Sequence, residues 1–295
     1  MLPRFPARTQ IRLLDACGTL GEEVERVLML PQLSMDERQR YSRQIGPGVL
    51  SPEAQTRLKG SVALVTRIGG VGGPAAMALA MAGIGKLIVA HGGLLESPDL
   101  NRQVLGSEAG IGLPRAEQFA ASLRNVSRFV DLEVIDHEPD DREAADLARR
   151  VSIILSCPAD FEHRLRLSRA AHRQGVPFID AAQWGMAGSL LVSDGISTPC
   201  LDCVYPDQPP FETHFPVIGA ISALMGNLAA LEAIKILSGV GRPMWGQMVL
   251  IDGFGGEMRQ ITLKRRVSCP VCGPYPPATG EKIKTSSSSS SVFAR

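Results

Sequence analysis

The feature that most constrains this chain is an alternation of short runs of branched apolar residues with Ala- and Leu-rich segments, which begins at residue 61. Residues 61–66 and 86–90 are predicted strands, and residues 72–82 between them are a predicted helix. A strand, a helix and a second strand in this order indicate a βαβ unit with parallel strands. The pattern continues with predicted helices at 115–125, 143–150 and 162–174 and predicted strands at 132–135, 152–156 and 177–181. A doubly wound, Rossmann-like α/β fold with a mostly parallel sheet follows.

The segment after residue 181 changes character, because glycines punctuate its apolar runs. Residues 188–192, 247–252 and 257–263 are predicted to continue the sheet with antiparallel strands. Residues 198–216 between them are rich in proline and lack a period, which is typical of a long surface loop that is either functional or mobile. We expect one domain over residues 35–273, with an N-terminal extension at 1–34 and a disordered serine-rich tail at 274–295.

Overall charge and hydropathy exclude several kinds of partner. The 31 basic and 30 acidic side chains give a formal net charge of +1, which does not draw the chain to nucleic acid or to an anionic membrane. The most apolar stretch, residues 217–237, is interrupted by Asn227, Glu232 and Lys235 and is predicted to be a buried helix rather than a membrane span. The first thirty residues lack the continuous apolar core of a signal peptide. A cytoplasmic location, with no nucleic-acid or membrane partner, is therefore expected.

Two CxxC motifs indicate a metal site. Cys200 and Cys203 form the first pair, and Cys269 and Cys272 form the second. Four thiolates suit a structural zinc ion with tetrahedral geometry. About 65 residues separate the pairs, so the fold has to bring them together, and a redox pair or reduced thiols are the alternatives. A zinc ion here would fasten the end of the domain to the long loop and would stabilise rather than catalyse.

A glycine-rich turn links the first predicted strand to the first predicted helix. Gly69, Gly70 and Gly72 stand where backbone amides and a helix N-terminus can approach a phosphate. An ordinary dinucleotide-binding fingerprint would place glycine at position 67 and an acidic residue at position 91, but Arg67 and His91 stand there. These two residues disfavour a nicotinamide or flavin enzyme, which the absorbance spectrum of the purified protein would reveal.

Several segments carry a resemblance in the same order along the chain. They are residues 40–45 (RYSRQI), 69–76 (GGVGGPAA), 96–103 (ESPDLNRQ), 230–237 (ALEAIKIL), 252–253 (DG) and the two CxxC motifs. Together they resemble the MoeB/ThiF/HesA family of ubiquitin-activating-enzyme-like adenylyltransferases, from about residue 36 to residue 273. So many ordered matches over most of the chain make a chance origin a poor explanation.

The resemblance implies adenylation with ATP and Mg²⁺ of the C-terminal carboxylate of a ubiquitin-like sulfur-carrier protein, similar to ThiS or MoaD. It assigns phosphate binding to Arg43 and Arg102, with Arg43 reaching across from the second subunit of a homodimer. Arg115 stands where the family has a phosphate-binding lysine, so the positive charge is kept while the length and geometry of the side chain change. The nucleotide contacts that the resemblance implies are Gly69, Gly70, Gly72, His91, Asn101, Arg102 and Arg115.

The chain departs from the family pattern at the nucleotide and metal contacts. His91 and Gly93 stand in place of two aspartates, and Ala159 stands in place of an aspartate associated with Mg²⁺. Asp160, one position later, is the candidate catalytic residue for that last role. Arg67 either adds a phosphate contact or obstructs the close approach of the nucleotide, since a side chain replaces glycine there.

Two functions are consistent with these residues. As an enzyme, the protein would adenylate a carrier and leave sulfur transfer to another protein, because no cysteine occurs between residues 204 and 268 to form the thioester of some relatives. As a binding protein, it would be a catalytically silent scaffold that docks a carrier protein or peptide, or pairs with an active paralogue. Carrier-dependent exchange of labelled pyrophosphate into ATP distinguishes the two.

Overall fold

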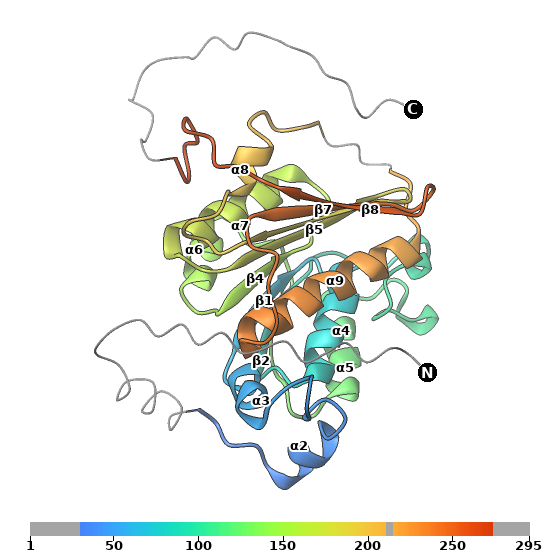
Figure 1. The fold of residues 1–295 in the computed structure, drawn as a ribbon. Helices are drawn as coiled ribbons and strands as arrows, with labels where there is room; N and C mark the ends of the chain where they lie inside the picture. The colour runs from blue at the N-terminus through green and yellow to red at the C-terminus, as the bar shows by residue number, and fades with distance from the viewer. Residues whose placement is uncertain (1–29, 211–214, 274–295) are drawn as a thin grey trace, which may run out of the picture.

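The structure, a computed structural model, describes residues 30–210 and 215–273 (Figure 1). Within these residues the strands form one eight-stranded sheet with the order β3-β2-β1-β4-β5-β6-β7-β8. The strands are β1 (Val62–Thr66), β2 (Lys86–Ala90), β3 (Asp131–Ile135), β4 (Ile153–Ser156), β5 (Phe178–Trp184), β6 (Ala187–Ser193), β7 (Gln247–Asp252) and β8 (Glu257–Thr262).

The sheet changes from parallel to antiparallel pairing at β5. β1 lies between β2 and β4 and is parallel to both, with Val65 opposite Val89 and Leu155. β5 is parallel to β4 but antiparallel to β6, where Asp180 faces Leu191. β7 and β8 continue the antiparallel half. The predicted doubly wound fold with an antiparallel continuation is therefore confirmed.

Helices cover both faces of the sheet. The helices are α2 (Met35–Arg40), α3 (Pro52–Lys59), α4 (Gly72–Ala82), α5 (Arg115–Val126), α6 (Asp141–Ala148), α7 (Phe161–Gln174), α8 (Leu201–Val204) and α9 (Gly219–Ser238), with 3₁₀ turns η1 (Ser97–Asn101) and η2 (Glu108–Gly110). Because neighbouring strand residues point to opposite faces, Val65 packs in a core with α4, α5 and α9, while Leu64 packs in a second core with α6 and α7.

The longest of these helices is α9, which crosses the near face of the sheet in Figure 1. Among the described residues it is the helix that is long and apolar enough, by length and composition, to cross a membrane. Its packing is that of a core helix, because a Cβ added at Gly226 would lie 2.2 Å from the Val71 carbonyl oxygen. On the sheet side, a Cβ at Gly188 would lie 2.4 Å from the sulfur of Met225 on α9. The apolar segment that was predicted to be a buried helix thus forms α9, which packs against both the glycine-rich turn and the sheet.

Several predicted boundaries differ from the structure. β5 extends to Trp184, three residues beyond the predicted end, because the strand keeps its partner β6 over this length. The predicted loop at 198–216 contains the short helix α8, and its residues 211–214 lie outside the described part. Helices α2 and α3 had no counterpart in the prediction. Residues 1–29 of the predicted extension and the predicted tail at 274–295 also lie outside the described residues.

Candidate functional site

The candidate site lies where the strand order reverses, between β1 and β4. In an open α/β sheet the crevice outside the carboxyl ends of such strands is the usual ligand site. The glycine-rich turn follows β1 here, and residues 157–159 follow β4. Together with η1 and the end of β5 they enclose a cavity of about 320 Å³, which we call the polar cavity.

The glycine-rich turn leaves backbone donors free at this cavity. The N–H groups of Gly70, Val71 and Gly72 donate to no acceptor within the described residues, whereas Gly73 donates to the Gly69 carbonyl. A Cβ at Gly72 would lie 2.5 Å from the Arg67 carbonyl oxygen, so the turn requires glycine there. These free amides precede α4, whose N-terminus adds a partial positive charge. The turn is therefore built to receive an anion.

Asp99 organises the cationic side of the polar cavity. Its Oδ1 accepts hydrogen bonds from Arg102 (3.2 Å) and Gln103 (2.7 Å), and its Oδ2 accepts from Arg115 Nε (3.1 Å) and Nη2 (2.5 Å) and from the Glu96 amide. Burial alone would raise the pKa of Asp99, but the hydrogen bonds and charges of Arg115 and its neighbours outweigh burial and lower that pKa. Asp99 thus stays ionised and fixes both guanidinium groups at the wall of the cavity.

His91 and Gln103 present uncharged acceptors beside Gly69. His91 is buried, and its Nδ1 lies 2.9 Å from the Gly92 carbonyl oxygen, so Nδ1 carries the proton and Nε2 faces Gly69 as an acceptor. Burial, followed by the charges of Arg67 and Arg115, lowers the pKa of His91 to about 4. The Oε1 of Gln103 is buried without a hydrogen-bond partner among the described residues. A ligand hydroxyl or amino group would satisfy these acceptors.

Most of the predicted nucleotide contacts lie together in the structure. Gly69, Gly70, His91, Arg102 and Arg115 line the polar cavity. Gly72 shapes the turn from its buried position at the start of α4.

Besides Gly72, three residues predicted for the nucleotide or catalytic site do not line the polar cavity. Asn101 is exposed, and its Oδ1 accepts a hydrogen bond from Arg102. Asp160 caps α7 and accepts hydrogen bonds from the His163 amide (3.0 Å) and from His163 Nδ1 (2.6 Å). Arg43 is exposed near α2.

The surroundings of Arg43 place it at the wrong end of α4 for its own cavity. Gln44 donates to the Ala82 carbonyl, and Tyr41 closely approaches Gly83, at the C-terminal end of α4. The cavity lies at the N-terminal end, roughly 16 Å away along an eleven-residue helix. Arg43 therefore does not lie at the cavity of its own chain, and its role at such a cavity stays a prediction.

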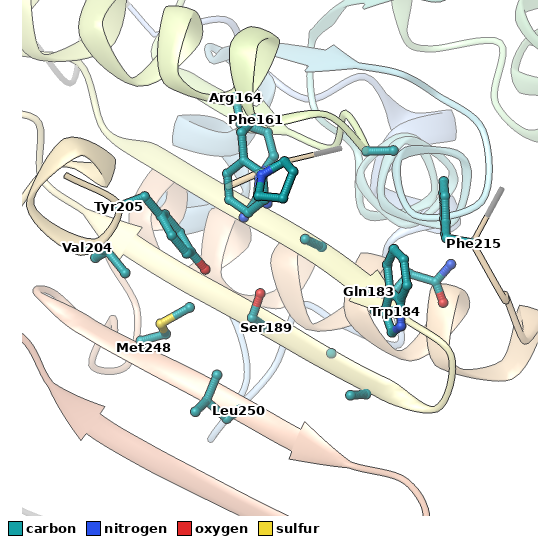
Figure 2. A pocket seen from close by; sticks show the side chains of 15 residues that line it. Phe161, Arg164, Gln183, Trp184, Ser189, Val204, Tyr205, Phe215, Met248 and Leu250 are labelled. Atoms are coloured by element: carbon teal, nitrogen blue, oxygen red, sulfur yellow. The ribbon is translucent and has the colours of Figure 1, made fainter. Parts of the chain in front are cut away.

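A second, mostly apolar hollow of about 460 Å³ adjoins the first, and we call it the apolar groove. Figure 2 shows Phe161, Arg164 and Tyr205 at one end, Gln183, Trp184 and Phe215 at the other, and Ser189 between them. Met248 and Leu250 of the neighbouring strand β7 complete it. These strand residues alternate with those that pack under α9, so the groove lies on the opposite face of the sheet.

Two ring pairs form the ends of the apolar groove. Arg164 lies 4.3 Å from the Phe161 ring centroid and 5.6 Å from that of Tyr205, and it pairs with buried Asp180 at 2.5 Å. At the other end the Trp184 and Phe215 rings stack with centroids 5.5 Å apart. This groove therefore has a rigid floor and aromatic walls, which suit an extended apolar peptide.

The groove and the polar cavity meet at four shared residues. Ala159, Ala182, Gln183 and Phe215 line both hollows. The two alanines offer methyl groups, and Gln183 has a buried Oε1 without a hydrogen-bond partner in the described part of the chain. A slender chain end could pass from the groove into the cavity here, with an N–H donated to Gln183.

Cys157 is the thiol nearest to this junction. It directly follows β4 and lines the polar cavity. Burial and then the charge of Asp180 raise the pKa of the Cys157 thiol well above its usual range. The thiolate needed for nucleophilic attack is therefore disfavoured, in agreement with the interpretation of Cys157 as a small apolar residue.

The four CxxC cysteines form one cluster. Their sulfur atoms all lie within 4.8 Å of one another, and Cys200 Sγ is 3.4 Å from Cys269 Sγ while Cys203 Sγ is 3.3 Å from Cys272 Sγ. Ligands of a tetrahedral zinc ion lie about 3.8 Å apart, given a Zn–S distance of about 2.3 Å. The four residues therefore fit a metal ion, which would join α8 to the segment after β8.

Some functional residues had no assigned role in the prediction. Asp99 and Gln103 lie within the segment 96–103 that carried the resemblance, but their position in a hydrogen-bond network appears only in three dimensions. Glu138, which pairs with Arg67 at 3.3 Å, and the apolar groove had no signal in the sequence, because their residues come from distant segments.

Fold and site together define a doubly wound α/β protein with a crevice at the switch point that is lined by arginine side chains and backbone amides, and with an adjoining apolar groove. Comparison with known proteins gives the family. The ThiF family matches residues 41–271, so the chain belongs to the ThiF family. Protein HesA, heterocyst, of Trichormus variabilis is 37% identical over 259 residues, which cover 86% of this chain and 97% of that protein.

Further relatives extend the comparison to named adenylyltransferases. Adenylyltransferase and sulfurtransferase MOCS3 of Mus musculus is 36% identical over 282 residues, which cover 91% of this chain and 61% of that protein. Among solved structures, MccB of E. coli has a TM-score of 0.71 at 18% identity, covering 86% of this chain and 77% of MccB. A complex of MccB with AMPCPP and MccA has a TM-score of 0.70 at 20% identity, covering 79% and 74%.

Proposed function

We propose that this protein transfers AMP from ATP to the C-terminal carboxylate of a ubiquitin-like sulfur-carrier protein. The observation that carries the proposal is that the apolar groove opens into the arginine-lined polar cavity at Ala159, Ala182, Gln183 and Phe215. A carrier tail in the groove would present its terminal carboxylate to phosphates held in the cavity. The family relationship to proteins named adenylyltransferases supports the same reaction.

The chemistry needs positioning and charge more than a protein nucleophile. A carboxylate oxygen of the tail attacks the α-phosphorus, the bond from that phosphorus to the bridging oxygen breaks, and pyrophosphate leaves with the electron pair. Arg102 and Arg115 and the free amides of the glycine-rich turn would stabilise the charge that develops on the phosphates. The rigid groove would lower the entropic cost of bringing the two anions together.

We infer that the working unit is a homodimer in the cytoplasm with one Zn²⁺ per chain. The dimer follows from the proposed role of Arg43, which lies at the far end of α4 from its own cavity. Zinc follows from the four clustered sulfur atoms.

The test is exchange of labelled pyrophosphate into ATP with purified full-length protein. We expect exchange only when a ThiS-type or MoaD-type carrier ending in glycine is added. Arg102→Ala should reduce the exchange rate by about a hundredfold, because a charged donor to the phosphates is lost. Arg124→Gln, a change on the exposed side of α5, is the matched control. No exchange with either carrier would overturn the proposal.

A second candidate function is a silent scaffold that binds the carrier or a peptide. It is favoured by Asp160, whose carboxylate caps α7 instead of lining the cavity. This function predicts that the same carriers bind in the absence of ATP and that no exchange occurs.

A further inference from the structure

Arg67 is held in a conformation that arginine rarely adopts. Its φ of 51° is the one positive φ among the described non-glycine residues. The left-handed region is unfavourable for an L-residue, and such strain persists where the surroundings enforce it, often at ligand sites. Glycine would remove this cost at the same backbone geometry. The side chain of Arg67, which lines the polar cavity, is therefore the feature that needs an explanation.

Most of the donors of Arg67 have no acceptor within residues 30–210 and 215–273. Its guanidinium has five N–H donors, and one nitrogen makes a long contact of 3.3 Å to Glu138 Oε1. Glu138 does not line the cavity, and burial raises its pKa, so it is a weakened counter-charge. Arg67 thus adds a third positive group to Arg102 and Arg115, and Asp99 already partly neutralises those two.

The carboxylate that lines the cavity is not available to a metal ion. Asp99 is the one carboxylate among the residues that line the cavity, and both its oxygens accept hydrogen bonds from arginine, glutamine or backbone donors. Asp160 does not line the cavity, and its Oδ1 accepts hydrogen bonds from His163, while Gly93 has no side chain. Mg²⁺ is bound by carboxylate oxygens together with water and phosphate. The side chains present therefore do not fit a magnesium ion held by the protein.

We propose that the polar cavity binds the triphosphate of a nucleotide without a protein-bound metal ion, and that Arg67 supplies the charge that a metal ion would otherwise supply. This deepens the proposed function, because it names the metal-free nucleotide as the form that the site recognises. Three guanidinium groups line the space together with the free amides of Gly70 and Val71, and guanidinium pairs with phosphate through charge-assisted hydrogen bonds. The orphan acceptor of Gln103 and the neutral His91 face the same space and suit the hydroxyl groups of a nucleoside.

The test is calorimetric titration of the full-length protein with ATP, once in excess EDTA and once in excess MgCl₂ at matched ionic strength. We expect ATP to bind in EDTA with a dissociation constant equal to or lower than that in MgCl₂. Arg67→Gly should weaken binding in EDTA by about tenfold or more, because a charged phosphate contact is lost while the backbone is relaxed. Arg67→Lys should keep part of the affinity, and Arg124→Gln should keep all of it.

Three results would overturn the proposal. They are ATP binding that requires MgCl₂, an Arg67→Gly variant that binds ATP as tightly as the wild type or more tightly, and no ATP binding in either buffer. The second result would show that Arg67 obstructs the site. Pyrophosphate exchange distinguishes this inference from the proposed function. ATP binding in EDTA without carrier-dependent exchange would contradict only the proposed reaction. Carrier-dependent exchange together with ATP binding that requires magnesium would contradict only this inference.

Discussion

At the scale of single residues, the local hydrogen bonds decide which charged groups are available for chemistry. Asp160 illustrates this, because its carboxylate is committed to the first turn of α7 and to His163. Burial alone would raise the pKa of Asp160, but the hydrogen bonds and charge of His163 lower it to about 2. The same hydrogen bond raises the pKa of His163. The sequence could indicate Asp160 as a candidate for the metal site, but it could not show that the carboxylate accepts the capping hydrogen bond of α7 instead.

The Asp160–His163 pair predicts a pH dependence. Since the pKa of His163 is raised, its contribution to stability is complete below about pH 6.5 and is lost as the pH rises through the folded-state pKa. The contribution of Asp160, whose pKa is lowered, is lost only as the pH falls from about 4 toward about 2. Asp160→Asn keeps the capping oxygen but removes the charge, so the pKa of His163 should fall toward its ordinary value. NMR titration of the His163 ring checks this, and equal pKa values in both proteins would contradict it.

At the scale of elements, the sequence predicted the strands and helices that follow from local patterns. It did not predict the sites that form where segments distant in the sequence come together. The pattern of apolar runs was sufficient for the strands from β1 to β8, and the parallel order of the first half follows from the βαβ rule. The glycine-rich turn lies beside Arg102 in the structure, because a Cβ at Gly70 would be 3.1 Å from Arg102 Cγ. The groove walls come from α7, α8 and three strands, so no local pattern could predict them. Likewise, the long separation of the CxxC pairs in the sequence could not show that they form one cluster, which the positions of the sulfur atoms show.

The cysteine cluster also links stability to the groove. Cys203 lies in α8, directly before Val204 and Tyr205, which form part of the groove wall. Arg266, in the segment after β8, donates its amide to Cys203 Sγ and a side-chain hydrogen bond to the Asp202 carbonyl. A metal ion bound by the four sulfurs would therefore hold this wall in place as well as the end of the domain.

Loss of the metal ion should therefore affect both folding and carrier binding. We expect about one zinc ion per wild-type chain by elemental analysis and little in Cys203→Ser. A loss of about 3 kcal/mol in the free energy of unfolding would lower the Tm by roughly 6–12 °C for a protein of this size. Carrier affinity should fall as well. Cys17→Ser, which leaves both CxxC pairs intact, is the control. Unchanged metal content in Cys203→Ser would be incompatible with the four-cysteine site.

At the scale of the whole molecule, α4 separates two halves of one proposed site. Its N-terminal end adjoins the glycine-rich turn, and its C-terminal end adjoins Tyr41 and Gln44, the neighbours of Arg43. Exposed apolar side chains at Met81 on α4 and at Leu224 and Leu231 on α9 are available for contact with another chain. These features are consistent with a paired arrangement in which each chain supplies Arg43 to the cavity of the other.

Mixing two inactive variants tests this arrangement. Arg43→Ala and Arg102→Ala should each lose pyrophosphate exchange, because either change removes a guanidinium from every site. After equal amounts are mixed and allowed to exchange subunits, half of the dimers are mixed and each holds one intact site, so about a quarter of the wild-type activity should return. Recovery should be absent if both arginines act within one chain. Mixing each variant with itself is the control.

The position of Arg43 has a consequence for how the protein behaves as its amount changes. If no single chain contains a complete site, turnover per chain depends on the fraction of chains that are dimeric. Dilution alone would then abolish activity without unfolding the protein. Activity would then climb steeply at low abundance and level off once pairing is complete, which makes cellular copy number a control on output.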